Sequence, residues 1–171
     1  ALNSNPDYNE WMEIYRKLVF WELEMKKSDS PEMQEVFETQ KQEANTEFFK
    51  FISRNYASWV SPKSTDGPIM SHTLLKYKVL PHLEKGTPLF FVLIDNLRFD
   101  QWKMIQPKFA ESFRIQEEET FYSILPTATQ YARNAIFAGM LPIDIEKQFS
   151  TQWKNDDEEG GKNLFEEEFL R

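Results

Sequence analysis

One uninterrupted apolar run constrains the fold more than any other feature of this sequence. Residues 89–94 read LFFVLI, and the run ends at Asp95. A short run with no polar residue on either face is typical of a β-strand that is buried on both sides. Such strands occur in parallel sheets whose two faces are covered by helices. The run therefore predicts a layered α/β structure in this part of the chain.

The segments that follow the run fit this prediction. NLRFDQWKMI, from residue 96, predicts a turn that leads into a helix, and residues 114–125 contain a second strand candidate. A helix is expected over residues 130–138, with Gly139 just past its end and Pro142 preventing its continuation. The order strand, helix, strand, helix indicates an α/β unit with parallel strands.

The chain before this unit is predicted to be helical. Asp7 can cap a helix whose apolar residues recur at steps of three and four as far as Met25. Ser30 and Pro31 are typical of the cap and first position of a second helix, which we expect to reach about Tyr56.

A third helix is predicted to begin near Ser71, and Pro81 should end or kink it. The helical segments together indicate an antiparallel hairpin or a three-helix bundle. We therefore divide the sequence into a helical bundle at residues 1–86 and an α/β part at residues 87–171.

Composition excludes several classes of function. The net charge of −8 argues against a broad surface for nucleic-acid backbones, although a pocket for a small phosphate ester remains compatible with it. No apolar run approaches the roughly 20 residues that a membrane span requires, and the polar, acidic N-terminal stretch does not resemble a signal peptide. The sequence contains no cysteine, which fits a cytoplasmic protein.

Two threonines stand in the stretch LPTATQYARNAIFAGMLP, residues 125–142. Thr127 and Gln130 have the spacing of a capping box, which assigns Thr127 a structural role at the helix start. Thr129 lies in the first turn, where backbone N–H groups and the helix dipole favour anions. A metal-bound hydroxyl at this position can attack a phosphorus atom, but a threonine in a first turn is often structural. Both interpretations of Thr129 stay open.

Asp95 also has two interpretations. It stands at the end of the predicted strand, where open α/β sheets place ligand sites, so its carboxylate can bind a divalent metal. Alternatively, Asp95 or Asn96 caps the next helix. Arg98 and Arg133 can contact a phosphate, although arginines on helix faces are usually solvated or paired. The two histidines, His72 and His82, lie ten residues apart, which is poor spacing for a shared metal.

The sequence resembles the PglZ family, a branch of the alkaline phosphatase superfamily. The resemblance rests on VLIDNLRFDQW and on PTATQYARNAIFAGMLP, and it covers about residues 88–142. It implies an alkaline phosphatase-like parallel-sheet core, here incomplete, preceded by an all-α helical bundle. In that superfamily the corresponding aspartate and hydroxyl residue bind a metal, usually zinc, in a two-metal site. The resemblance thus implies that Asp95 is a metal ligand and that Thr129 is both ligand and nucleophile, with Thr127 as the fallback.

The helical part is similar to the linker bundle of PorX-type response regulators of type IX secretion. This similarity implies a cytoplasmic two-component regulator that answers to a sensor histidine kinase and hydrolyses oligonucleotide-type phosphodiesters. The family's remaining metal ligands are aspartates and histidines from later in the domain, and no histidine follows Asp95 here. We therefore expect an internal fragment, or the ordered part of a longer protein, that is inactive alone, with further ligands beyond Arg171. The alternative is a non-catalytic signalling and protein-interaction module that forms a homodimer through its helical bundle.

Overall fold

The computed structural model describes residues 5–27, 30–62, 66–83, 86, 88–154 and 161–170. The chain forms two compact units, and each consists of two separate stretches of sequence. The first unit comprises Ala1–Gly67 and Asn96–Thr120, and the second comprises Pro68–Asp95 and Phe121–Arg171. Within the described residues, no helix combines the length and apolar character needed to cross a bilayer. The sequence-based division at residue 86 stays a prediction.

Two long helices of the first unit begin where the sequence predicts. Helix α1 (Tyr8–Met25) has Asp7 as its N-cap, and its capping box is complete: the Asp7 side chain accepts from the backbone of Glu10, and the Glu10 side chain accepts from Asp7 N. Helix α2 (Pro31–Trp59) is capped by Ser30 and ends three residues later than expected, at Trp59. Both starts follow from side chains that satisfy otherwise unpaired N–H groups.

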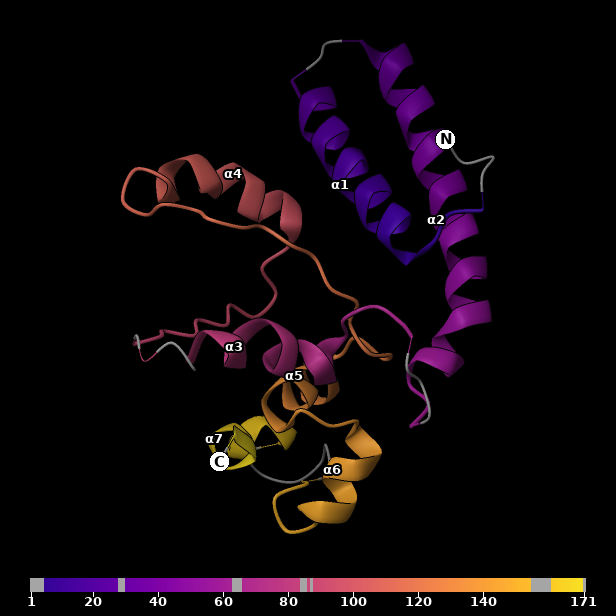
Figure 1. The fold of residues 1–171 in the computed structure, drawn as a ribbon. Helices are drawn as coiled ribbons and strands as arrows, with labels where there is room; N and C mark the ends of the chain where they lie inside the picture. Colours follow the sequence, from indigo (N-terminus) through magenta and orange to yellow (C-terminus); the bar gives the residue numbers. More distant parts are fainter. Residues whose placement is uncertain are drawn as a thin grey trace. The chain divides into compact units, whose positions relative to one another are not determined.

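Helices α1 and α2 form an antiparallel hairpin and lie side by side (Figure 1). The contacts show the direction: Glu22 pairs with Lys41, Trp11 packs on Phe48 at 5.2 Å between ring centroids, and Tyr8 meets Trp59. The most buried side chains of the pair are Trp11, Val19, Phe37 and Ala44. The predicted hairpin is therefore confirmed, and aromatic rings form much of its core.

A third helix of the first unit, α4 (Phe99–Phe109), packs against α1. Glu118, in the segment after α4, accepts hydrogen bonds from Trp102 at 2.7 Å and from Lys103 at 2.8 Å, while its backbone oxygen accepts from Arg16 of α1. Burial alone would raise the pKa of Glu118, but the hydrogen bonds from Lys103 and Trp102 and the nearby positive charges outweigh it, so the pKa lies below its ordinary range. Glu118 thus links three segments of this unit.

The second unit is built around helix α5 (Thr129–Ala138). The elements of this unit that precede α5 are the 3₁₀ turn η1 (Ser71–Thr73), the π-helical turn η2 (Leu75–Val79) and the short α3 (Leu80–Leu83). Those that follow are α6 (Pro142–Gln148), the 3₁₀ turn η3 (Lys162–Phe165) and α7 (Glu166–Leu170). Four of these elements, η1, α6, η3 and α7, contact α5 (Figure 1).

The core of the second unit lies against α5. Its apolar members are Met70, Leu75, Ile124, Ala135, Ile136, Ile145 and Phe169. A parallel bridge joins Met70 to Tyr122, and the buried Ser71 hydroxyl accepts from the backbone of Ile124 at 3.2 Å. Helix α5 ends at Gly139, whose positive φ of 63° is the left-handed conformation that favours glycine at a helix end.

The described residues contain no β-strand, so the predicted parallel sheet is not confirmed. Residues 89–94 lie outside any regular element, with Phe90 90% and Val92 75% exposed, while Phe91 packs on Phe137 of α5. The second strand candidate, within residues 114–125, is reduced to the bridge at Tyr122. The physical reason is that a strand needs a neighbour for its backbone N–H and C=O groups, and no neighbouring strand stands beside this run in the described chain.

The three remaining local predictions have different outcomes. Near Pro81, which is predicted to end or kink the third helix, the π-helical turn η2 precedes the proline and α3 is described to Leu83. Helix α5 ends before Pro142 as expected, and Pro142 is the first residue of α6, a position where its missing N–H costs nothing. The cap predicted after Asp95 is wrong. The helix after Asp95 is capped by Arg98, whose N–H donates to the Gln101 side chain, so neither Asp95 nor Asn96 is the cap.

The capping box of α1 yields a stability prediction. Asp7→Ala removes the acceptor for two backbone N–H groups and should lower the free energy of unfolding by about 1 kcal/mol. Asp7→Asn keeps an oxygen in the same place and should lose much less. Urea denaturation of both variants measures the difference, and equal losses would show that the cap contributes little.

Glu118 yields a prediction that depends on pH. Because its folded pKa is depressed, its contribution to stability is present above the ordinary glutamate pKa of about 4.3 and is lost as pH falls through the folded value. Glu118→Gln should cost about 1–2 kcal/mol near neutral pH. The cost should shrink as pH falls from about 5 towards 3. Urea titrations across this range, with the exposed neighbour variant Glu117→Gln as control, test both statements.

Candidate functional site

The structure brings together the two residues that the sequence singles out, Asp95 and Thr129. Both belong to the second unit. The Thr129 hydroxyl lies 3.5 Å from Asp95 Oδ1, although 34 residues separate them in sequence. This is longer than an ordinary hydroxyl hydrogen bond, so it is a close contact that a modest movement would tighten. Beyond Asp95 the chain turns through Asn96, which has a left-handed φ of 57°, a conformation that asparagine tolerates.

The two threonines do not divide their roles as the sequence predicts. The N-cap of α5 is Ala128, and no side chain caps this helix, so the predicted capping box between Thr127 and Gln130 is wrong. The first turn begins one residue later than that motif requires. Ala128 O instead accepts the backbone N–H groups of Tyr131 and Ala132. Of the two hydroxyls, Thr129 is the one that faces the Asp95 carboxylate.

Arg133, one turn along α5 from Thr129, connects the site to α7. Its guanidinium donates to Asp95 Oδ2 at 3.2 Å and, through Nε, to the Glu166 carboxylate. The hydrogen bond to Glu166 and the neighbouring negative charges, including Asp95, raise the pKa of Arg133 above its ordinary value. Arg133 is therefore a paired residue, one of the alternatives that the sequence left open.

Asn163 and Asn134 extend this network. Asn163 Nδ2 lies 2.9 Å from Glu166 Oε1, 3.1 Å from Asn134 Oδ1 and 3.4 Å from Thr129 O. Asn134 is completely buried, and its amide donates to Gln130 O within α5. Sequence reasoning missed Asn163 and Glu166, because nothing in NLFEEEF distinguishes one glutamate from the next two.

The other candidates from the sequence, Arg98, His72 and His82, lie outside this network. Arg98 pairs with Asp100 in the first unit through two contacts of 2.9 Å, and that hydrogen bond lowers the pKa of Asp100. In the second unit, burial lowers the pKa of His72, whose Nδ1 has no hydrogen-bond partner in the part of the chain described. His82 is exposed. Neither histidine joins a metal-binding cluster, since the described residues include no group of three or more His, Cys, Asp or Glu side chains able to hold a metal.

The family resemblance implies a zinc site at Asp95 and Thr129. Asp95 and Thr129 supply two oxygen ligands, whereas a catalytic zinc site takes about three protein ligands and a structural site about four. Glu166, the nearest further carboxylate of this network, is engaged by Arg133 and Asn163. The described residues alone therefore do not fit a complete zinc site.

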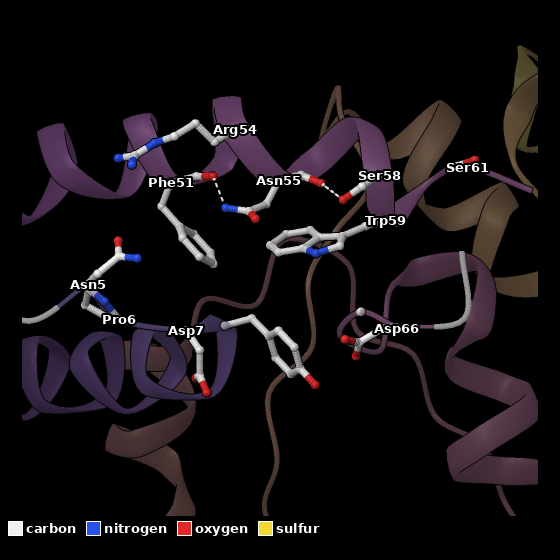
Figure 2. Close-up of a pocket in the computed structure, with 12 residues that line it drawn as sticks. Asn5, Pro6, Asp7, Phe51, Arg54, Asn55, Ser58, Trp59, Ser61 and Asp66 are labelled. Carbon is white, nitrogen blue, oxygen red and sulfur yellow. Dashed lines mark hydrogen bonds between the residues drawn. The ribbon is translucent and has the colours of Figure 1, made fainter. Parts of the chain in front are cut away.

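A separate pocket of about 780 Å³ lies in the first unit, at the end of the hairpin where α1 begins and α2 ends. Figure 2 shows the rings of Phe51 and Trp59 extending from α2 into this pocket, which Pro6, Asp7 and Asp66 also line. None of the candidate catalytic or metal-binding residues from the sequence, such as Asp95 and Thr129, lines this pocket. The chemistry-bearing residues are thus not located in this cavity.

Comparison with protein-family models gives two matches. Residues 1–60 match the PorX response regulator linker domain, and residues 74–171 match the BREX system PglZ alkaline phosphatase-like domain. A search of curated proteins found no match. The second match includes Asp95, Thr129, Arg133 and Glu166 and spans more than half of the chain. The chain therefore belongs to the PglZ family of alkaline phosphatase-like domains, with a PorX-type response-regulator linker at its N-terminal end.

Proposed function

We propose that this chain is part of a response regulator whose PglZ output domain is a metal-dependent phosphodiesterase for oligonucleotide-type phosphodiesters. The observation that carries the proposal is the 3.5 Å approach of the Thr129 hydroxyl to the Asp95 carboxylate at the start of α5. The matches to a PorX-type linker and an alkaline phosphatase-like domain support it. From the same matches we propose control of type IX secretion or gliding, a sensor histidine kinase as partner and a cytoplasmic location.

Thr129 is the proposed nucleophile. Its oxygen would form a bond to phosphorus as the bond to the leaving ester oxygen breaks, and the hydroxyl proton would end on that leaving oxygen. Water would later cleave the phospho-threonine and regenerate the hydroxyl. The first turn of the ten-residue helix α5 suits this step, because its N–H groups and dipole favour the negative charge of a phosphoryl group. Asp95 would orient the hydroxyl through the contact already present.

The charge of the site supports a metal requirement. Asp95 and Glu166 carry two negative charges and Arg133 one positive charge, so the group is net negative and repels an anionic phosphodiester. A bound divalent cation would reverse that sign, and zinc is the ion that the family implies. Its further ligands would have to come from other parts of the protein.

We also propose that residues 89–94 become a strand of the alkaline phosphatase-like parallel sheet when neighbouring strands are supplied.

Thr129→Ala tests the nucleophile. In the protein expressed from its complete reading frame and assayed with zinc on bis(p-nitrophenyl) phosphate and a short oligonucleotide, the variant should lose roughly a thousandfold or more of kcat, as removal of a covalent nucleophile does. Thr127→Ala is the matched control, two residues away and outside the α5 cap, and should stay near wild type. Full activity in Thr129→Ala would overturn the assignment of this residue.

A groove in the first unit favours a second function, an interaction module that dimerises through the helical bundle. The groove measures about 720 Å³ and lies between α1 and α2. Its apolar wall includes Trp21, Met33 and Val36, each more than half exposed. Apolar side chains gathered in one exposed groove are typical of a protein-binding surface. A second copy of the hairpin would present the same groove, as an isologous dimer requires.

Val36→Lys tests this second function. A lysine in the groove should convert a dimer into a monomer in sedimentation velocity of the whole chain, because an unpaired charge would be buried at the interface. Gln42→Lys adds the same charge to an exposed position of α2 that does not line the groove, so it should leave the dimer intact. A wild-type chain that sediments only as a monomer would argue against dimerisation.

A further inference from the structure

Arg133 pairs with two carboxylates at once, which a surface arginine does not normally do. Its side chain is 25% exposed and bonds two carboxylates from different segments, Asp95 in the loop after residues 89–94 and Glu166 at the start of α7. The partners lie 38 and 33 residues away in sequence. A planar guanidinium can serve both at once because its N–H groups point in fixed directions, whereas a lysine ammonium is a single point charge.

Asp95 depends on such partners for its position. It belongs to no helix or strand, and its side chain is 42% exposed, so regular backbone structure does not fix the carboxylate. Its Oδ1 lies by the Thr129 hydroxyl while its Oδ2 accepts from Arg133. With one oxygen held by Arg133, rotation of the carboxylate is restricted and the other oxygen stays toward Thr129.

Glu166 in turn limits where the guanidinium can go. It accepts from Arg133 Nε and from Asn163, and Asn163 also reaches Thr129 O and the buried Asn134. The network therefore returns to the first turn of α5, the same turn that carries the Thr129 hydroxyl. Glu166, Arg133 and Asp95 form a chain of ionic contacts from α7 to the threonine.

We propose that Arg133, held by Glu166, is a positioning residue that fixes the Asp95 carboxylate beside the Thr129 hydroxyl. For its effect on catalysis the inference rests on the proposed function, but the positional coupling can be measured without any activity. The segment around Glu166, which sequence reasoning left without a role, thereby becomes a support of the site.

The test uses Glu166→Gln, Arg133→Gln and Arg133→Lys, with Glu168→Gln as the matched control. Glu168 is exposed, lies on the same short helix and accepts from the half-buried Gln152, so its variant removes the same charge without touching Arg133. In the full-length protein, Glu166→Gln and Arg133→Gln should each lower kcat about tenfold or more through loss of a charge-assisted contact. KM should change less than about threefold, because substrate binding is largely kept. Arg133→Lys should recover part of the loss.

The second readout is NMR of the same folded variants. Glu166→Gln should speed hydrogen exchange at Arg133 Nε–H and shift the carboxyl carbon signal of Asp95, whereas Glu168→Gln should change neither. Wild-type kcat and an unmoved Asp95 signal in Glu166→Gln would overturn the inference. If the wild-type protein hydrolyses no phosphodiester, the proposed function fails, and the NMR result alone decides the positional claim: a shifted Asp95 signal supports it and an unchanged one rejects it.

Discussion

Burial of α5 is the constraint on which the second unit depends. Ala135 is fully buried and Ile136 nearly so, and η1, α6, η3 and α7 all pack on this one helix. Since η1 and α7 lie far apart in sequence, the apolar side of α5 determines that both pack on the same helix. The first turn of the same helix carries Thr129, and Arg133 follows one turn later. The candidate site thus follows from packing on a single ten-residue helix.

The site is held mainly by side-chain contacts between segments. Asn134 connects this polar network to the core of the unit. It is completely buried in α5, its amide donates to Gln130 O, and its Oδ1 accepts from Asn163. A buried amide needs its hydrogen bonds satisfied, so the position of Asn163, and with it Glu166, is tied to the core. The charges of the site are fixed relative to one another because the polar network begins inside the packed region.

Residues 89–94 show what a local sequence pattern can and cannot predict about secondary structure. The apolar run is specific enough to predict a doubly buried strand, yet Phe90 and Val92 are largely exposed, and Phe91 is partly exposed although it packs on Phe137. Strand formation depends on a partner for the backbone, which the run itself does not contain. Helices α1 and α2 behave in the opposite way, since their hydrogen bonds are internal and their caps are encoded within three residues.

The sequence by itself determined the two capped helices, their hairpin, the end of α5 at Gly139 and the choice of Asp95 and Thr129 as candidates, because each of these depends on residues close in sequence or on a local motif. Tertiary structure decided the 3.5 Å contact between those candidates, the absence of a Thr127 cap and the pairing of Arg133 with both Asp95 and Glu166. Side chains separated by more than 30 residues meet only after burial of α5 has chosen their neighbours, and no short motif encodes that choice.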